Sequence, residues 1–464
     1  MTNLLNLQRS RTSHDPVNDQ RAALLPRYEG RAPRYTSYPT AVQFTPDVDA
    51  ATYSQWLTEM PAGEPLSIYI HVPFCARLCW YCGCNTRVVN SRETIGGYVD
   101  LLLKELDLVA SRLGGPHPVS HIHFGGGTPN MLSPDQLDAL FGALRNRFEF
   151  RDDAEIASEL DPAHLTAEWA QAAARNGLNR ASLGIQDLSP QVQAAVNRHE
   201  PFEIVQRASG YLREAGIEAL NFDLMYGLPR QSADDVLTTL DQVLTLRPRR
   251  VALFGYAHVP WMKSHQKLLP EAELPGPAER LHQSLAAAER LRADGYVPVG
   301  LDHFALPDDP LASGNVRRNF QGYTTDGAST LIGLGASAIG RLPQGYVQNQ
   351  PGELAWRQAI AKGELATIRG VPLTDDDRFR GEIIEQLMCD FTVDLADVCS
   401  RHGRDFSDLA QALDQLAEPL HDGVAELAGA RLTITNIGRP YLRTVCAAFD
   451  AYLDPAATRH SAAV

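Results

Sequence analysis

Apolar runs alternate with segments of helical periodicity through the middle of the chain. From about residue 67, six short apolar runs recur at intervals of a few tens of residues. The runs are SIYIHVPF (67–74), HIHFGGG (121–127), EIASELD (155–161), RASLGIQD (180–187), ALNFDLMYG (219–227) and RVALFGYAHV (250–259). Between them, apolar residues repeat at helical spacing at Tyr98, Leu102, Leu106, Val109 and Leu113 and within 134–146, 164–175, 203–214 and 234–246. This alternation predicts a parallel sheet with helices outside it.

Six strand–helix units are fewer than the eight of a closed barrel. The runs are nearly all apolar, and their few polar residues lie near the carboxyl ends, as expected of barrel strands. The pattern therefore predicts an α/β fold built on a partial (β/α)6 barrel, open on one side, over residues 66–365. Its chemistry is expected in the loops at the carboxyl ends of the strands.

The 464 residues exceed one ordinary domain, and both flanks of the barrel region differ from it in pattern. Residues 1–65 show no long periodic segment, but RYEGRAPRYTSYPT is aromatic-rich and predicts an ordered N-terminal arm. In 366–464, Thr374 and three aspartates begin a predicted helix. Helices over 377–389, 393–401 and 407–417, a hairpin at GVAELAGARLTIT and a last helix at IGRPYLRTVCAAFDAYL resemble a winged helix.

Charge argues against nucleic acid as a partner. The formal net charge is −14, and from residue 372 onward 16 Asp and Glu face 8 Arg and no Lys. Phosphate binding needs the opposite balance, so the winged-helix-like domain is expected to serve in packing. No apolar run approaches the roughly 20 residues of a membrane span, and the first residues do not form a secretory signal. We therefore expect a cytoplasmic protein that binds no membrane.

Four of the seven cysteines lie within ten residues, in HVPFCARLCWYCGCN directly after the first predicted strand. Such density in a large chain indicates metal or redox chemistry. Zinc sites favour two separated C-x2-C pairs, which are absent here, and buried inert thiols would not cluster. Cys84 lies too near Cys82 to reach a fourth iron easily. Three ligands, Cys75, Cys79 and Cys82, would leave one iron of a [4Fe–4S] cluster open to a substrate.

This C-x3-C-x2-C spacing, with an aromatic residue before the last cysteine, resembles the signature of the radical S-adenosylmethionine (SAM) superfamily. The resemblance implies that the open iron chelates SAM and that reductive cleavage yields a 5′-deoxyadenosyl radical, which abstracts hydrogen.

A wider set of motifs narrows the resemblance. RYTSYPT, YIHVPFCARLCWYCGCN, FGGGTPN, LGIQDL, FDLMYGLPRQ, YAHVP, DHFALPDD, RNFQGYTT and LIGLGASAIG occur in this order between residues 27 and 453. Together they resemble the oxygen-independent coproporphyrinogen III dehydrogenases, which decarboxylate the ring A and B propionates of coproporphyrinogen III oxidatively to vinyls, giving protoporphyrinogen IX in anaerobic haem synthesis. The resemblance also implies a reductant such as flavodoxin or ferredoxin, and a monomer.

The same resemblance assigns contacts to two SAM molecules. For the cluster-bound molecule it indicates Tyr69, Gly126, Glu159 and Ile339. For a second molecule it indicates Tyr81, Gly127, Thr128, Gln186, Arg198, Asp223 and Ala257. These positions also make physical sense, because a glycine permits close approach of the backbone and polar residues at strand ends can line a pocket.

The implied substrate is a bulky polyanion, so arginines should bind it. Arg31 and Arg34 in the arm, and Arg317 and Arg318 before NFQGYTT, are the candidates, with surface solvation as the competing interpretation. His71 and His303 are expected to be structural.

Two alternatives stay open: a haem chaperone on the same barrel, and a related radical SAM enzyme that acts on another tetrapyrrole. Such chaperones typically carry an aromatic residue at the position of Cys84 and lack the arm, so both features favour the dehydrogenase. Cys84 is therefore a candidate catalytic residue.

Overall fold

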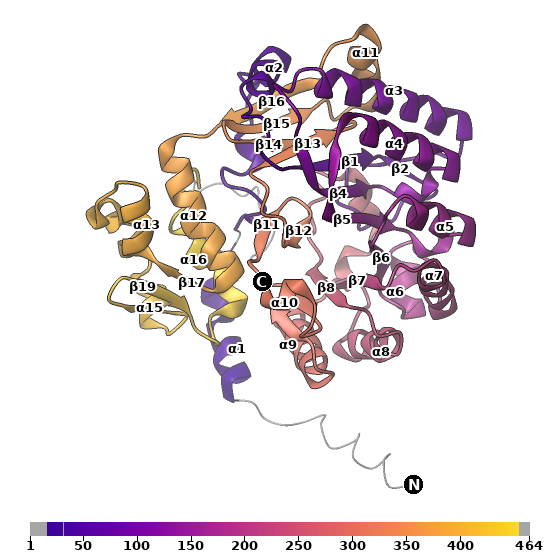
Figure 1. The fold of residues 1–464 in the computed structure, drawn as a ribbon. Coiled ribbons are helices and arrows are strands. Elements are labelled where there is room, and N and C mark those ends of the chain that lie inside the picture. Colours follow the sequence, from indigo (N-terminus) through magenta and orange to yellow (C-terminus); the bar gives the residue numbers. More distant parts are fainter. Residues whose placement is uncertain (1–15, 31, 454–464) are drawn as a thin grey trace.

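The computed structural model describes residues 16–30 and 32–453, and its centre is a sheet curved into a partial barrel (Figure 1). Six successive parallel strands form the wall: β1 (Leu66–Val72), β4 (Pro118–Gly126), β5 (Glu149–Leu160), β6 (Arg180–Gln186), β7 (Ala219–Tyr226) and β8 (Arg250–Gly255). Helices cover the outer side: α3 (Arg92–Ala110), α4 (Pro134–Arg147), α5 (Ala167–Arg175), α6 (Pro190–Ala195), α7 (Phe202–Glu214), α8 (Ala233–Leu244) and α9 (Pro277–Ala293). The predicted α/β fold is confirmed, with a strand at each of the six apolar runs.

Helix ends differ from the predictions by a few residues, and the capping groups explain one of them. α5 begins at Ala167, because the Thr166 side chain accepts a hydrogen bond from the Trp169 amide at 3.2 Å. The residues before it, Pro162–His164, form a separate 3-10 turn. α3 ends at Ala110, so Leu113 lies beyond the helix that its spacing predicted.

The sheet continues past the six barrel strands on both sides and reaches twelve strands. Beyond β1 lie β13 (Thr330–Leu334), β14 (Ile339–Leu342), β15 (Gly345–Asn349) and β16 (Thr367–Pro372). Beyond β8 lie β10 (His303–Ala305) and β9 (Val297–Val299), both antiparallel to their neighbours. Within the described residues the terminal strands β9 and β16 do not pair with each other, so the barrel is open. These added strands have at most six residues, which is too short for a clear apolar pattern.

The inner face of the barrel is more polar than the sequence pattern suggested. In β6, Leu183 and Ile185 are buried toward the helices, whereas Ser182 and Gln186 line an internal cavity. Polar residues were expected only near the carboxyl ends of the strands, but they recur along the inward side of several strands. A closed barrel fills its interior with apolar side chains, whereas this open barrel encloses a cavity that needs polar walls.

The C-terminal unit is mainly helical and has its own apolar core. Its helices are α12 (Asp375–Asp390), α13 (Leu395–Arg401), α14 (Ala410–Gln415), α15 (Ala417–His421) and α16 (Leu442–Ala447). Its antiparallel sheet has the order β17 (Thr392–Asp394), β19 (Arg431–Ile434), β18 (Ala425–Ala428). Thr374 begins α12 in a reciprocal capping arrangement with Asp377, as its sequence predicted. Helices followed by a hairpin give the winged-helix-like arrangement.

The last helix is shorter than predicted. Only Leu442–Ala447 is α-helical, preceded by a 3-10 turn at Arg439–Tyr441 that contains Pro440. After the helix the chain turns, Phe449 becomes fully buried, and the Ala451 amide donates to the Tyr38 hydroxyl at 2.9 Å. Tertiary contact with the arm therefore replaces the last predicted helical turns.

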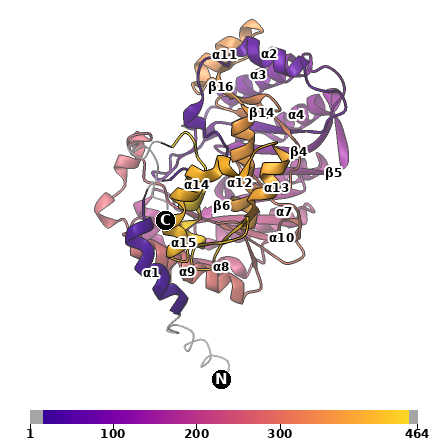
Figure 2. The same cartoon turned by 90° about the vertical axis from the view of Figure 1, so that its left-hand side faces the viewer.

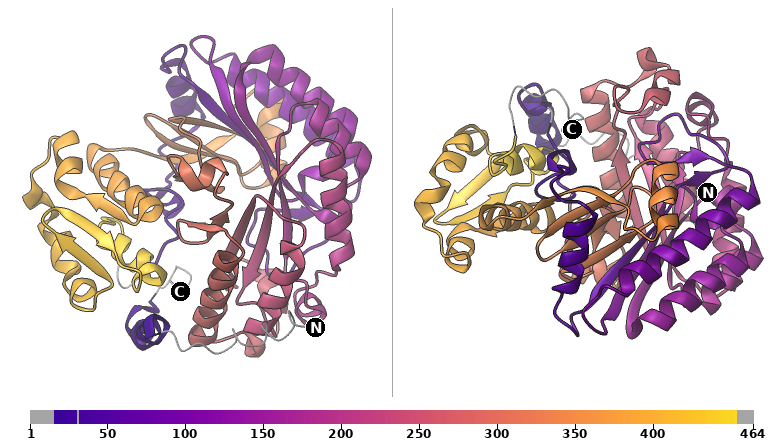
Figure 3. Two further views of the ribbon diagram at one scale, coloured as in Figure 1. Left: turned by 60° about the horizontal axis from the view of Figure 1, so that its bottom comes forward. Right: turned by 90° about the horizontal axis from the view of Figure 1, so that it is seen from above.

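The N-terminal arm contains two helices and joins the two units. α1 (Pro16–Tyr28) buries Leu25 and Tyr28 in the C-terminal core, and Arg21 donates to the Asn436 carbonyl at 2.6 Å. α2 (Ala50–Thr58) buries Trp56 in the barrel core instead. Figures 2 and 3 show the C-terminal unit on one side of the barrel with α1 against it. The connection between these helices carries the RYTSYPT motif past the cavity.

Candidate active site

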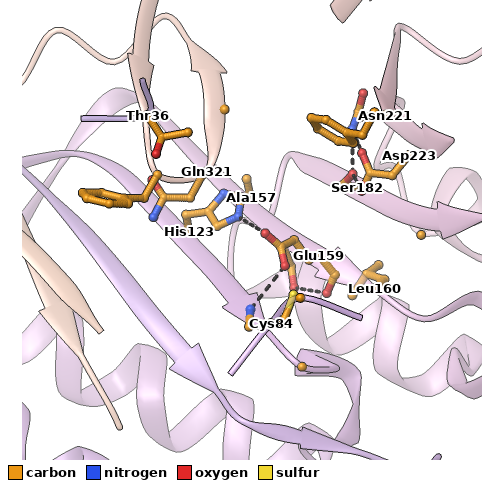
Figure 4. A pocket seen from close by; sticks show the side chains of 18 of the residues that line it. Thr36, Cys84, His123, Ala157, Glu159, Leu160, Ser182, Asn221, Asp223 and Gln321 are labelled. Carbon is orange, nitrogen blue, oxygen red and sulfur yellow. Dashed lines mark hydrogen bonds and ion pairs between the residues drawn. The ribbon is translucent and has the colours of Figure 1, made fainter. Parts of the chain in front are cut away.

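A cavity of about 650 Å³ opens inside the barrel. Its wall includes inward-facing residues of all six parallel strands, the loop after β1, and the hairpin of β11 (Arg317–Asn319) and β12 (Gly322–Thr324). Figure 4 shows side chains from separate strands converging on this space. All four clustered cysteines and nine of the eleven predicted SAM contacts line it. Residues far apart in sequence thus meet where a barrel fold keeps its chemistry.

Short backbone contacts hold the cysteine loop against the end of β4. β2 (Phe74–Cys75) pairs with β3 (Arg87–Val88) and closes the loop at its base. The Gly127 amide donates to the Val72 carbonyl at 2.8 Å, and the Thr128 amide donates to the Phe74 carbonyl at 2.7 Å. The loop is therefore positioned by the same GGGTP segment that the sequence resemblance singled out.

The thiols lie in different polar surroundings within the loop. Cys75 Sγ lies 3.0 Å from Thr86 Oγ1 and 3.5 Å from Thr128 Oγ1, and burial raises the pKa of this thiol. The Cys84 amide donates to Cys82 Sγ at 3.4 Å, and a hydrogen bond from the Cys84 thiol helps lower the pKa of Cys82 to about 7. Thiolate is the form that binds iron, so the surroundings of Cys82 favour ligation.

Arg198 contacts the cysteine loop from the segment after α6. Its Nη1 lies 3.5 Å from Cys79 Sγ, and its Nη2 lies 2.9 Å from Glu200 Oε2 and donates to the Gly184 carbonyl. Both Arg198 and Glu200 are buried. Arg198, a predicted SAM contact, is thus already paired with a carboxylate, and it also places positive charge beside a predicted cluster ligand.

The three predicted ligands suit a cluster in chemistry and position. Cys75, Cys79 and Cys82 all line the cavity, on a loop that backbone hydrogen bonds hold. Among residues 16–30 and 32–453, no three His, Cys, Asp or Glu side chains converge on one point as the ligands of a single ion do. Each thiolate of a cubane cluster binds a different iron, so its ligands surround the cluster instead.

Glu159 is an ionised carboxylate held inside the cavity. Its Oε1 lies 3.1 Å from His123 Nε2, and its Oε2 accepts from the Gly126 amide at 3.2 Å. Burial opposes ionisation, but these hydrogen bonds and the nearby histidines outweigh it and lower the pKa of Glu159. Figure 4 shows Glu159 with His123 on one side and Cys84 on the other. Such a carboxylate can accept from ribose hydroxyls or an ammonium group.

Two glycines stand where no side chain fits. Gly126 has φ +109°, and a Cβ there would lie 2.6 Å from the His71 ring. A Cβ at Gly127 would lie 2.6 Å from the Phe74 carbonyl oxygen. Packing of this segment against His71 and Phe74 by itself therefore explains why both positions are glycine. Their expected approach to SAM stays a prediction.

Asp223 belongs to a small polar network on β6 and β7. Ser182 donates to one of its carboxylate oxygens at 2.7 Å, and Asn221 donates to the other at 2.8 Å (Figure 4). Burial raises the pKa of Asp223 to about 6. Gln186, at the end of β6, has φ +70°, an uncommon conformation for a residue with a side chain. Both residues face the cavity, as predicted.

One glutamine ties together two further predicted contacts. Gln266 is buried, and its Nε2 donates to the Tyr81 carbonyl at 2.9 Å and to the Ala257 carbonyl at 3.2 Å. Tyr81 itself is buried in an apolar cluster with Cys79 and Tyr256. The segment after β8 is thereby attached directly to the cysteine loop.

Two predicted contacts do not line the cavity. The Tyr69 hydroxyl lies 2.9 Å from His71 Nδ1, and its ring stacks on His123 with centroids 6.0 Å apart. Ile339 is the first residue of β14 and pairs with Gln348. Tyr69 therefore supports residues of the wall from behind, and a direct ligand contact of either residue stays a prediction.

Arginines gather in another part of the cavity wall. Arg34 Nη2 donates to the Gly255 carbonyl at 2.7 Å, and the Arg318 guanidinium lies over the Tyr323 ring, 4.3 Å from its centroid. Arg318 Nε and Nη1 are buried and make no hydrogen bond to any described residue. Nearby, Asp302 Oδ1 lies 2.8 Å from His303 Nδ1. We call Arg34, Asp302, His303, Arg318 and Tyr323 the arginine group.

The arginine group carries an excess of positive charge. Its one carboxyl group, Asp302, has its pKa lowered to about 2, because the hydrogen bond from His303 and the charges of Arg318 and Arg34 outweigh burial. Two guanidinium groups therefore face one carboxylate. A buried guanidinium with unsatisfied donors is suited to bind a carboxylate ligand.

The remaining sequence candidates fall outside this group. Arg317 does not line the cavity; it is exposed and lies 3.6 Å from Glu385. Arg31 lies outside the described residues. His71 is structural, as expected, since its Nε2 lies 2.9 Å from the Asn85 carbonyl and its other ring nitrogen contacts Tyr69. His303, in contrast, lines the cavity.

Sequence reasoning missed His123 and Asp302. Alternation along HIHFGGG places His123 on the same face of β4 as His121, and Asp302 is the first residue of the DHFALPDD motif. The sequence thus placed both residues on recognisable motifs. It did not show that His123 contacts Glu159 or that Asp302 contacts His303.

Comparisons with known proteins agree with this site. Residues 69–243 match the radical SAM superfamily. The chain is 49% identical to an oxygen-independent coproporphyrinogen III oxidase of Bradyrhizobium diazoefficiens, over 94% of this chain and 98% of the relative. It is 43% identical to that of Paracoccus denitrificans, over 94% and 97% of the two chains.

A solved structure extends the similarity to three dimensions. The coproporphyrinogen III oxidase of Escherichia coli, described as a radical SAM enzyme, superposes with a TM-score of 0.86 at 37% identity, over 90% of this chain and 98% of that one. The similarity covers the barrel, the cysteine loop and the C-terminal unit together. The chain therefore belongs to the oxygen-independent coproporphyrinogen III oxidases of the radical SAM superfamily.

Proposed function

We propose that this enzyme decarboxylates the ring A and B propionates of coproporphyrinogen III to vinyl groups and releases protoporphyrinogen IX. The observation that carries the proposal is one cavity that combines the three cysteines of the C-x3-C-x2-C motif with the arginine group. The first part fits a radical cofactor, and the second fits a substrate with several carboxylates. The relatives named for this activity match nearly the whole chain.

The cysteine loop would hold the cofactors. Cys75, Cys79 and Cys82 are the ligands for a [4Fe–4S] cluster, and Glu159 is placed to bind the SAM molecule beside it. When bound, the cluster and SAM would supply hydrogen-atom abstraction at a propionate β-carbon, and the electron left after loss of CO2 would pass to an external one-electron acceptor. The protein orients that carbon and excludes water from the cavity.

The arginine group would hold the substrate. Arg34 comes from the arm and Arg318 from β11, and each places a guanidinium group at the cavity. Arg318 has buried donors that no described residue satisfies, which a propionate carboxylate would satisfy. Asp302 holds His303 in orientation, so that this ring can donate or accept at the substrate.

A second SAM molecule is part of the proposal. Asp223 and Gln186 offer polar groups on the cavity wall, with Tyr81, Gly127, Thr128 and Ala257 nearby in the same wall. Arg198 is paired with Glu200, so it would act here by holding Cys79 and the wall in place as well as by contacting a ligand.

We further infer a cytoplasmic monomer that receives electrons from flavodoxin or ferredoxin. No helix in residues 16–30 and 32–453 is long and apolar enough to cross a membrane. The predicted division into an arm (1–65), a barrel (66–365) and a C-terminal domain (366–464) is part of the same proposal. Separate apolar cores in the barrel and the C-terminal unit support it, although β16 (Thr367–Pro372) belongs to the barrel sheet and α1 packs into the C-terminal core.

The direct test is an anaerobic assay of the reconstituted enzyme with coproporphyrinogen III, SAM and dithionite. We expect protoporphyrinogen IX and two equivalents of CO2 per substrate molecule. Reductive SAM cleavage without decarboxylation would indicate a different tetrapyrrole substrate. Tight binding of haem with neither activity would indicate a chaperone.

A further inference from the structure

An exposed apolar and basic segment covers the outer side of the cysteine loop. It runs from His258 to Leu269, between β8 and α9, and includes a 3-10 turn at Ser264–Leu268. Trp261, Met262 and Leu268 are 51%, 65% and 56% exposed. The part of the chain between β8 and α9 projects from the body of the molecule (Figure 2). Exposed tryptophan and methionine on one short segment are typical of protein contact surfaces.

The charge of this segment is opposite to that of the protein as a whole. The chain has a net charge of −14 and only four lysines, and two of them, Lys263 and Lys267, lie here. No Asp or Glu occurs between His258 and Leu269. Glu271 follows and is exposed, with its Oε1 3.6 Å from His258 Nε2, and the next carboxylate, Glu273, is paired with Arg230. A local positive patch on an acidic protein favours an acidic partner.

Side chains of the same segment hold the backbone of the cysteine loop. His265 Nε2 lies 2.7 Å from the Cys82 carbonyl oxygen, Lys263 donates to the Cys84 carbonyl at 2.9 Å, and Gln266 donates to the Tyr81 carbonyl. The cysteine side chains face the cavity. The surface residues are thus separated from a predicted cluster ligand by one layer of loop backbone and the side chains bound to it.

We propose that residues 258–269 are the docking surface for an acidic one-electron carrier protein. The inference rests on the proposed function, because SAM cleavage requires one electron from outside for each molecule cleaved. SAM and the substrate occupy the cavity during turnover, so the electron enters from the outer side of the loop. The carrier is oxidised by one electron and the cluster is reduced by one. Carriers of this kind form small, weak interfaces, and a short segment is large enough for one.

The test measures binding and electron delivery separately, with flavodoxin as the probe. Lys267 and Met262 are exposed, so Lys267→Glu and Met262→Ser should leave the fold and the dithionite-driven rate unchanged. We expect Lys267→Glu to weaken flavodoxin binding about tenfold by calorimetry and to lower flavodoxin-driven SAM cleavage by a similar factor at low salt. Met262→Ser should weaken binding with little change in its salt dependence.

The matched control is Lys362→Glu, which makes the same charge change at an exposed lysine on α11 (Glu353–Lys362). It should leave flavodoxin binding unchanged.

Equal effects of Lys362→Glu and Lys267→Glu would overturn the proposal, as would unaltered binding in both segment variants. Loss of lipid-vesicle binding or of self-association in Met262→Ser, with flavodoxin binding intact, would assign the surface to a membrane or to a second copy. If wild-type enzyme binds flavodoxin but makes no protoporphyrinogen with dithionite, the proposed function fails and the docking surface stands.

Discussion

The cavity has two functional parts that are built in different ways. The cysteine loop, its supports Glu159 and Arg198, and the segment after β8 that holds the loop backbone all belong to the barrel. The arginine group is assembled from the arm, the residues around β10 and the β11–β12 hairpin. It is also tied to the C-terminal unit, because the Tyr323 hydroxyl donates to the Met388 carbonyl at 2.8 Å.

This difference separates two tasks. Under the proposed assignment, SAM cleavage would depend on the barrel alone. Substrate recognition would depend on three parts of the chain that must dock together. Damage to the first part should therefore abolish radical chemistry, whereas damage to the second should impair substrate binding and leave SAM cleavage intact.

The largest effect is expected at the cluster ligands. Cys79→Ala should remove the cluster, because two thiolates hold a cubane poorly, and SAM cleavage and turnover should both be lost. Iron and sulfide content and visible absorption measure this directly. Cys399→Ser is the control, since Cys399 is buried in the C-terminal core away from the cavity. Full iron content in the Cys79 variant would refute the ligand assignment.

A smaller effect is expected in the arginine group. Arg318→Met should raise the KM for coproporphyrinogen III about tenfold to a hundredfold, since each tenfold is about 1.4 kcal/mol of lost binding. SAM cleavage without substrate should continue at the wild-type rate. Arg317→Met, at an exposed neighbour outside the cavity, should change neither value. Equal losses in both variants would show that Arg318 acts through the fold of the hairpin.

Cys84 belongs to the cysteine loop and lies in the cavity beside Glu159, so its replacement separates cluster ligation from a role in the reaction (Figure 4). Cys84→Ser should retain iron, sulfide and cluster absorption, because three other cysteines supply the ligands. Turnover should fall about tenfold, the effect of losing one well-placed contact. Loss of iron would make Cys84 a ligand, and normal turnover would leave it without a role in the reaction.

The smallest effect concerns Asp223, on the strand between the two parts. Its folded-state pKa of about 6 exceeds its ordinary value of 3.8, so the folded state binds more protons between these values. Stability due to this group therefore falls as pH rises toward 6 and is constant above it. Between pH 5 and pH 7, Asp223→Asn should gain about a degree or two in Tm relative to the wild type in calorimetry. A Tm difference that is the same at both pH values would contradict the raised pKa.

Local pattern was sufficient for much of the fold. Each of the six apolar runs became a barrel strand, and Thr374 began its helix, because short segments carry their own periodicity and caps. The cysteine motif was equally local, since its ligands lie within eight residues of one another. The last helix and the ends of α3 and α5 were predicted less well, because tertiary contacts and single caps decide where a helix ends.

The sequence by itself therefore determined the strand–helix order, the position of the cysteine loop and, through its ordered motifs, the family. Only the tertiary structure decided that Arg198 pairs with Glu200 while contacting Cys79, and that Arg318 donates to the carbonyl of Arg34, 284 residues away. It also decided that the barrel interior is polar, because an open sheet leaves its inward faces to a cavity. Partners so distant in sequence leave no local pattern, since their pairing depends on which surfaces the folded units bring together.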